Sequence, residues 1–212
     1  VLLAGALIAA PKAKNEPPMK ATLIESRKLW DAAPHNAFTD LIRWKDRFWC
    51  AFREGRGHVS TDGRIRVLSS PDGDKWDSAA VIKLASYDLR DAHLSVTPAG
   101  KLMLVGGAAA RKKDGQQVPT DSFVSFSADG KDFSAPKLVT KDGWWLWQVS
   151  WHGKTAYGVA YTKTGGKYRG RLMTSADGLT WTALVDDWLA GQGPSETTLR
   201  FDGDVCYALV RR

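Results

Sequence analysis

Two acidic residues of this 212-residue chain lie in contexts suited to proton transfer. Glu196 follows Gly193-Pro194-Ser195, a rigid turn that would present its carboxyl group, and Asp91 precedes a predicted strand. Carboxyl groups act as general acids or bases when they are held beside a reacting bond. We therefore predict Glu196 and Asp91 as candidate catalytic residues, although Asp91 beside Arg90 also fits a simple ion pair.

Residues of a second set have types suited to binding a ligand, because arginine forks grip anionic groups and tryptophans stack on flat apolar faces. The predicted ligand-contacting residues are Arg53, Arg211, Arg212, Arg90, Glu54, His35, His58, Asp40, Gln148 and Trp147. The tryptophan cluster from Trp144 to Trp151 fits a hydrophobic core as well as a ligand platform. We expect no metal and no cofactor, because no His/Cys/carboxylate cluster shows ligand spacing.

A repeated turn motif indicates how these residues are positioned. The pattern Ser-x-Asp-Gly-x-x-aromatic occurs at 70–76, 127–133 and 175–181, so its first serines (Ser70, Ser127 and Ser175) are 57 and then 48 residues apart. The Ser and Asp side chains can bond nearby amides, and the Gly permits a left-handed backbone. We interpret the motif itself as a structural staple, and its period as that of a radial array of sheets.

Four β-hairpins accompany the motifs. They are predicted at 41–44 with 48–53, 94–97 with 102–105, 148–151 with 156–161, and 197–201 with 205–210. Third strands (65–68, 123–126, 171–173) and fourth strands (80–83, 137–139, 182–185) flank the three motifs, and no amphipathic helix is evident. Four antiparallel strands in about 50 residues match one propeller blade. The sequence therefore predicts an all-β protein, a β-propeller of four-stranded antiparallel blades with about three and a half blades present.

This architecture places the candidate residues together. In a four-stranded meander, the starts of the first strands and the ends of the second strands lie on one face, and the motif turns lie on the other. The first strands are innermost, so the residues at their starts are predicted to converge on a central pocket.

Composition and the N-terminus bear on partners and location. The charge balance of 30 basic and 23 acidic residues gives +7, but no lysine-rich stripe alternates with aromatic residues, so we expect no nucleic-acid partner. Residues 1–10 are apolar, too short to span a bilayer, and fit the end of a secretory signal, with a buried strand as the alternative. We expect residues 1–20 to be a partial signal peptide and linker, residues 21–212 to form one domain, no membrane span, and a secreted or periplasmic location.

The two cysteines, Cys50 and Cys206, fall in the first and fourth predicted units. Export would permit a disulfide between them. Because separate blades would hold them apart, we expect two free, buried thiols.

The chain resembles the sialidase superfamily, the six-bladed propellers with Asp-box or BNR repeats. The three Ser-x-Asp-Gly-x-x-aromatic turns carry the resemblance, which covers about residues 30–212. It implies that the chain is a fragment of a six-bladed protein, and that the nucleophilic tyrosine and a third arginine belong to later blades. By the same resemblance, Glu196 occupies the place of the glutamate that activates the tyrosine, and Arg211 or Arg212 that of a carboxylate-binding arginine.

Two further segments extend the resemblance. Residues 52–56 look like an arginine-containing strand end of the first blade, and the following loop offers Asp62 and His58 where the family has its acid/base aspartate, with Asp91 as a second candidate. The stretch 36–40 has no arginine where the family carries Arg-Ile-Pro. The resemblance thus implies an exported, exo-acting glycosidase with a carbohydrate substrate that need not be sialic acid, monomeric as the full-length protein. The alternative is a non-catalytic propeller that binds glycans or proteins.

Overall fold

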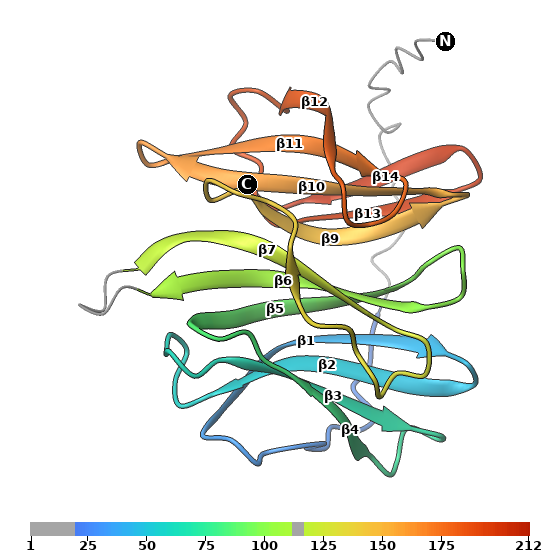
Figure 1. Cartoon of the computed structure of the whole chain (residues 1–212). Helices are drawn as coiled ribbons and strands as arrows, with labels where there is room; N and C mark the ends of the chain where they lie inside the picture. The colour runs from blue at the N-terminus through green and yellow to red at the C-terminus, as the bar shows by residue number, and fades with distance from the viewer. Residues whose placement is uncertain (1–19, 112–116) are drawn as a thin grey trace.

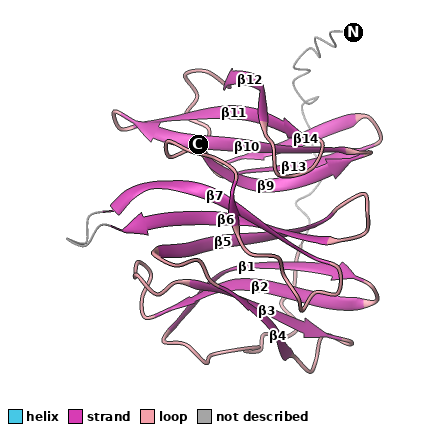
Figure 2. Cartoon of the chain, in the orientation of Figure 1, coloured by secondary structure: helices cyan, strands magenta, loops and turns pink. Residues whose placement is uncertain are grey.

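The computed structural model describes residues 20–111 and 117–212, and in these ranges every regular element is a β-strand (Figures 1 and 2). Three antiparallel sheets have four strands each, in the orders β1-β2-β3-β4, β5-β6-β7-β8 and β9-β10-β11-β12, and β13 pairs with β14 alone. Successive sheets stack as the blades of a partial β-propeller, which confirms the predicted fold class.

The bounds of the strands are as follows: β1 His35–Trp44, β2 Arg47–Gly55, β3 Arg64–Ser70, β4 Asp77–Ile82, β5 Tyr87–Val96, β6 Leu102–Arg111, β7 Gln117–Ser127, β8 Lys137–Leu138, β9 Trp145–His152, β10 Thr155–Thr164, β11 Lys167–Ser175, β12 Thr182–Trp188, β13 Thr197–Asp202 and β14 Val205–Val210. All four predicted hairpins are present. The first strands of the first three sheets begin several residues earlier than predicted, because their polar, bulged beginnings lack the apolar alternation that marks a strand in sequence.

The hydrophobic core lies between successive sheets. Trp49 and Ala51 of β2 pack with Leu102 and Leu104 of β6 in a cluster between the first two sheets. On the other face of β6, Met103 joins a cluster that includes residues of β9 and β10. Because successive residues of a strand point to opposite faces, a blade buried on both sides reads as a continuous apolar run, as the segment 102–105 does.

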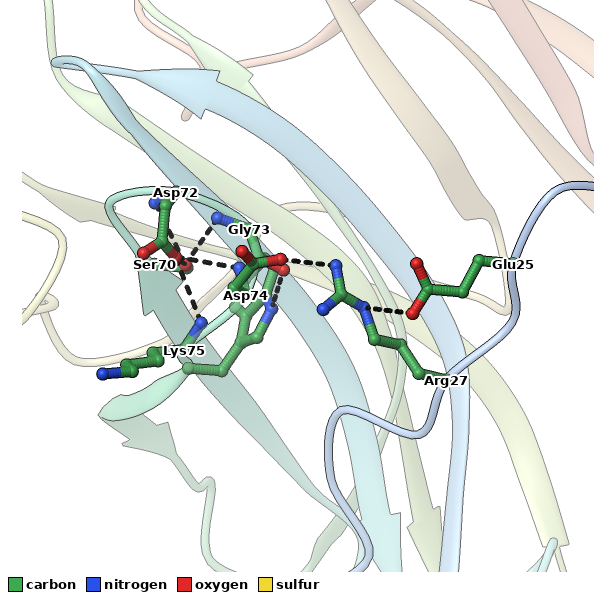
Figure 3. Close-up of polar contacts among 8 residues, drawn as sticks. Glu25, Arg27, Ser70, Asp72, Gly73, Asp74 and Lys75 are labelled. Carbon is green, nitrogen blue, oxygen red and sulfur yellow. Dashed lines mark hydrogen bonds and ion pairs between the residues drawn. The ribbon is translucent and has the colours of Figure 1, made fainter.

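The three Ser-x-Asp-Gly turns share one geometry (Figure 3 shows the first). In the first, Ser70 Oγ accepts a hydrogen bond from Gly73 N at 2.8 Å, and Asp72 Oδ1 accepts from Asp74 N at 2.8 Å and Lys75 N at 3.1 Å. The turns at 127–133 and 175–181 repeat these bonds. The predicted staple is therefore confirmed.

The second and third turns also join neighbouring blades. A Cβ on Gly130 would lie 2.1 Å from the Trp49 ring of the first sheet, and one on Gly178 would lie 3.2 Å from Met103 of the second. Both glycines have positive φ, 79° and 73°. The backbone angle favours glycine at both turns, and at Gly130 the close approach of the Trp49 ring requires it as well.

The segment before β1 lies along the first sheet. Arg27 Nη2 donates to Asp74 Oδ1 at 2.5 Å and its Nε lies 3.6 Å from Glu25 Oε1, which ties residues 25–27 to the first turn (Figure 3). Trp30 packs on a small cluster around Cys50 and Phe52. Residues 1–19, where the signal segment is predicted, lie outside the described residues. Within the described residues no helix is long and apolar enough to cross a membrane.

Both cysteines are free, as predicted, but only Cys50 is buried. Cys206 is exposed, which corrects the prediction of two buried thiols. It lies on β14, whose pairing within the described residues is with β13 alone. Val205, Tyr207 and Leu209 of the same strand are exposed for the same reason.

Candidate active site at the hub

The inner strands β1, β5, β9 and β13 lie side by side in sheet order, and the first three carry a β-bulge near their beginnings. Residues 38–39 of β1 oppose one residue of β2, residues 91–92 of β5 oppose one of β6, and residues 147–148 of β9 oppose one of β10. Bulges re-aim side chains and are frequent next to active sites. Predicted site residues Asp91, Trp147 and Gln148 all lie within these bulges.

Asp91 has the most perturbed environment among the predicted acids. It is 6% exposed, and its φ of 44° is unusual for a residue other than glycine. Burial raises its pKa to about 6, against the pull of Arg90, and the negative charge of Glu196 raises it further. Glu196 of the fourth sheet therefore lies near enough to Asp91 of the second sheet to influence its pKa.

Glu196 and Arg211 form an ion pair at the edge of the fourth sheet. The β13–β14 ladder continues past its last strand residues, since Ser195 N donates to Arg211 O at 2.9 Å and Arg211 N donates to Glu196 O at 3.1 Å. The side chain of Arg211 is 66% exposed and that of Glu196 31%. Arg212 turns elsewhere and donates to Gln192 Oε1 at 2.8 Å. Of the two predicted arginines, Arg211 is thus the one placed beside Glu196.

A cluster of rings lies beside these charges. Trp145 stacks on Tyr161 with centroids 5.9 Å apart, Trp147 lies 5.7 Å from Trp145, and Tyr168 lies 5.9 Å from Tyr161. A Cβ on Gly107 would lie 2.6 Å from the Trp145 ring, so this glycine makes room for the ring. Burial raises the pKa of Tyr161, and the charges of Glu196 and Asp91 add to this effect. Tyr161 is therefore a protonated hydrogen-bond donor at neutral pH.

His93 joins the ring cluster from β5, with its centroid 4.9 Å from that of Trp147. Both of its ring nitrogens are buried without a hydrogen-bond partner, and Nδ1 lies 3.9 Å from Asp40 Oδ2. Burial lowers its pKa, although the Asp40 carboxylate acts in the opposite direction. Asp40 itself accepts a hydrogen bond from Leu94 N at 2.7 Å and so joins the first and second sheets.

Arg53 and Glu54 were both predicted to contact a ligand, but the structure buries them completely. Arg53 donates from Nε and Nη2 to Asp88 Oδ1 at 2.9 and 2.8 Å, and its other bonds go to Gly57 O and Ser60 Oγ. As the next residue of the strand, Glu54 points to the opposite face. There it accepts from Trp30, Arg64 and Arg66.

Hydrogen bonds within the protein engage both groups, whereas the sequence predicted that Arg53 clamps an anionic ligand and that Glu54 contacts a ligand. Burial alone would raise the pKa of Glu54, but the hydrogen bonds from Arg66, Arg64 and Trp30 outweigh it and lower the pKa. Sequence position at a strand end identified these residues, yet it could not show that internal partners would satisfy them.

A second group of predicted residues gathers at the start of β1. The rings of His35, His58 and Phe38 contact one another, with centroids 5.3 to 6.3 Å apart. Arg90 is 8% exposed, donates to His58 O at 3.3 Å and lies over the Phe38 ring. The loop after β2 is thus brought to the bulges of β1 and β5, as predicted.

Asp62 and Gln148 are the remaining predicted residues, and both already have partners within the protein. A hydrogen bond from Ser60 lowers the pKa of Asp62, and the neighbouring Arg56 backbone N–H acts in the same direction. A carboxyl with a lowered pKa is a poor proton donor at neutral pH, so Asp91 fits the acid role better than Asp62. Gln148 is 5% exposed and accepts from Thr198 Oγ1 at 2.7 Å, which joins the third and fourth sheets.

Buried polar atoms without a partner concentrate at this hub. Six such atoms belong to residues near the starts of β1, β5 and β9: His35 Nδ1, Asn36 Oδ1, Arg90 Nε, His93 Nδ1, His93 Nε2 and Trp145 Nε1. Orphaned buried polar atoms are rare in folded proteins and call for a cause, such as a bound molecule. Among the described residues, no group of three or more His, Cys, Asp and Glu side chains could hold a metal ion.

Tyr161, Tyr168 and Asp88 were missed in the sequence. A signal existed for Tyr161, since it ends the predicted second strand 156–161 as Arg53 ends 48–53, and repeat alignment therefore places both at the hub. Nothing in the sequence distinguishes Asp88 as the buried partner of Arg53, because their contact joins different blades.

No family model matches the chain, and no curated relative matches its sequence. Its fold is similar to a protein of unknown function from Dyadobacter fermentans DSM 18053, with a TM-score of 0.69 and 18% identity over 84% of this chain and 62% of that one. Trypanosoma rangeli sialidase is similar with a TM-score of 0.61 and 16% identity, over 83% of this chain and 34% of that one. A Bombyx mori GH32 beta-fructofuranosidase is similar with a TM-score of 0.59 and 15% identity, over 79% of this chain and 39% of that one.

At these identities the likeness shows the fold alone. The chain spans between 34% and 62% of the length of these three structures. Two of the three are glycoside hydrolases by name, and the T. rangeli enzyme has been solved in complex with sialic acid.

Proposed function

We propose that this chain belongs to an exported glycoside hydrolase that removes sugars from the ends of glycans, with its active site at the hub. The observation that carries the proposal is the raised pKa of Asp91. Its pKa of about 6 keeps a fraction of Asp91 protonated near neutral pH, and the negative charge of Glu196 contributes to this raised pKa. A carboxyl group whose pKa is raised by its environment is typical of the general acid in glycoside hydrolysis.

In this proposal Asp91 donates a proton to the leaving oxygen, and Glu196 acts as base or activates a nucleophile. Arg211, exposed beside Glu196, binds an anionic group of the ligand. Trp147 offers a ring for the apolar face of a sugar, and Tyr161 donates a hydrogen bond. The unpartnered atoms of His93 and Arg90 would bind sugar hydroxyl groups or the water that replaces them. The apolar run at residues 1–10 supports export.

One observation favours a second candidate, a non-catalytic propeller that binds glycans. The guanidinium group of Arg211 already engages the Glu196 carboxylate, which the enzyme would need free to act on a substrate or a nucleophile. The two candidates predict the same ligand at the same place and differ only in turnover.

A panel of 4-methylumbelliferyl glycosides, including a sialoside, tests the proposal on the full chain. We expect turnover of at least one substrate, with kcat lowered about 10²- to 10⁴-fold by Asp91→Asn and by Glu196→Gln. Arg56→Gln, an exposed change in the β2–β3 loop, is the matched control and should leave kcat unchanged. If the wild type cleaves no glycoside faster than the Glu196→Gln variant does, but still binds a sugar, the non-catalytic candidate replaces the enzyme.

A further inference from the structure

Two hollows lie on the face opposite the hub, between the outer parts of neighbouring blades. The larger, of about 940 Å³, is lined by the β5–β6 turn, β7, the β9–β10 turn and the third Ser-x-Asp-Gly turn. The smaller, of about 300 Å³, lies between β4 and the second turn. Ser134 and Ala135 line both hollows, so the two adjoin at these residues.

The positively charged residues that line the two hollows are all lysines. Lys101, Lys137 and Lys154 line the larger part, and Lys83 and Lys131 line the smaller. All five are exposed, and none forms an ion pair or hydrogen bond through its side chain with another described residue.

The acidic residues that line the hollows are fewer than the lysines. Asp132 lines the smaller part and Asp177 the larger. Asp177 is engaged by the backbone N–H groups of Thr180 and Leu179, both at 2.7 Å. Five lysines against two aspartates give the track formed by the two hollows a local excess of positive charge, which attracts an anionic ligand.

The walls between these charges are apolar. Trp151, Phe126 and Leu179 line the larger part, and Phe133 lines the smaller. Aromatic faces beside cations suit a sugar ring that carries an acidic group, because the ring packs on the apolar wall while the acid meets an ammonium group. No arginine lines either hollow, whereas phosphate recognition in nucleic acids favours the arginine fork.

We propose that these two adjoining hollows form a second binding site, distinct from the hub, for an extended acidic polysaccharide. It would hold the protein on a polyanionic glycan while the hub, on the opposite face, remains free. Because lysines line both hollows, three the larger and two the smaller, the arrangement favours several sugar units over a single one.

Isothermal titration calorimetry on the full chain tests this site, with an oligogalacturonate as the probe. The fully methyl-esterified form of the same oligomer is the uncharged control. We expect the acidic oligomer to bind, the ester to bind at least about tenfold more weakly, and the affinity for the acid to fall as NaCl rises from about 50 to about 300 mM, because salt screens exposed charges.

Variants locate the binding. Lys101→Gln, Lys137→Gln and Lys154→Gln together should weaken binding about tenfold or more, since each removes an exposed attraction. The matched control is Lys20→Gln, Lys141→Gln and Lys167→Gln, which makes the same charge change at exposed lysines outside both hollows. The triple lysine variant should cleave small glycosides at the hub as the wild type does. The binding assay therefore tests the second site, and the glycoside assay separately tests the proposed hydrolase.

Three outcomes would overturn the proposal. One is no measurable binding of the acidic oligomer at low salt. Another is equal binding by the first variant and its control, which places the ligand elsewhere. The third is tighter binding of single-stranded DNA or of a polyglutamate peptide than of the oligogalacturonate, which would assign the track to another class of polyanion.

Discussion

Arg53 and Asp88 form a fully buried ion pair that joins the first and second blades, with both side chains 0% exposed. A Cβ on Gly63 would lie 1.8 Å from Asp88 Oδ1, so the loop after β2 closes over the pair only because glycine stands there. The pair orders the β2–β3 loop that brings His58 to the hub. The sequence predicted Arg53 as a ligand clamp, but in the structure this ion pair stabilises the loop that carries His58.

Breaking this pair should be strongly destabilising. Arg53→Met leaves the Asp88 carboxylate buried without its guanidinium partner, and we expect a loss of about 3–5 kcal/mol in the free energy of unfolding. Urea denaturation measures it, with the exposed Arg56→Met as control. The double variant Arg53→Met with Asp88→Leu should lose less than the single one, because the Asp88 carboxylate is then removed together with the guanidinium group. A single variant as stable as the wild type would refute the buried pair.

Asp91→Asn should stabilise the protein at alkaline pH while it removes activity. The folded pKa of about 6 lies above the ordinary value of 3.8, so Asp91 supports folding at low pH and costs stability as pH rises from about 4 through 6. The shift corresponds to about 3 kcal/mol at pH 8, which the neutral amide would recover. Asparagine also tolerates the positive φ.

The pH dependence of unfolding in denaturant checks this prediction. The wild type should lose stability between about pH 4 and pH 6 relative to Asp91→Asn, and the two curves should run parallel above about pH 7. Curves that run parallel over the whole range would show that Asp91 has an ordinary pKa and would remove the main support for its role as acid.

The third turn should weaken in acid. Hydrogen bonds from Thr180 N and Leu179 N lower the pKa of Asp177 to about 2, so its contribution is complete above about pH 4 and is lost as pH falls towards 2. Asp177→Ala should cost about 1 kcal/mol at pH 7. Asp177→Asn keeps the acceptor oxygen and should retain most of that stability without the acid dependence. Equal acid dependence in wild type and Asp177→Asn, measured by urea denaturation at several pH values, would contradict the assignment.

The two thiols should differ sharply in reactivity. Cys206 is exposed, whereas Cys50 is buried and burial raises its pKa to about 11. Because the thiolate is the reactive form, a thiol reagent at pH 8 should label one cysteine quickly in the native protein and both in denaturant. Mass spectrometry of labelled peptides identifies the site, and Cys206→Ser should abolish the fast reaction.

The sequence by itself determined the blades. The Ser-x-Asp-Gly turns and the alternating hairpins depend on contacts between residues close in the chain, so their local chemistry predicted the four-stranded units. The same reasoning selected Asp91, Glu196, Arg211 and Trp147 as candidates for the proposed site at the hub.

Only the tertiary structure decided which polar groups are free and which are satisfied. Arg53, Glu54 and Gln148 have the same residue types as ligand-binding groups, but partners from other blades or from the N-terminal segment satisfy them. The bulges that turn Asp91 and Trp147 also depend on register between strands, which the residue pattern alone does not encode. Burial and the field of distant charges set the pKa of Asp91, and both arise only when the blades stack against one another.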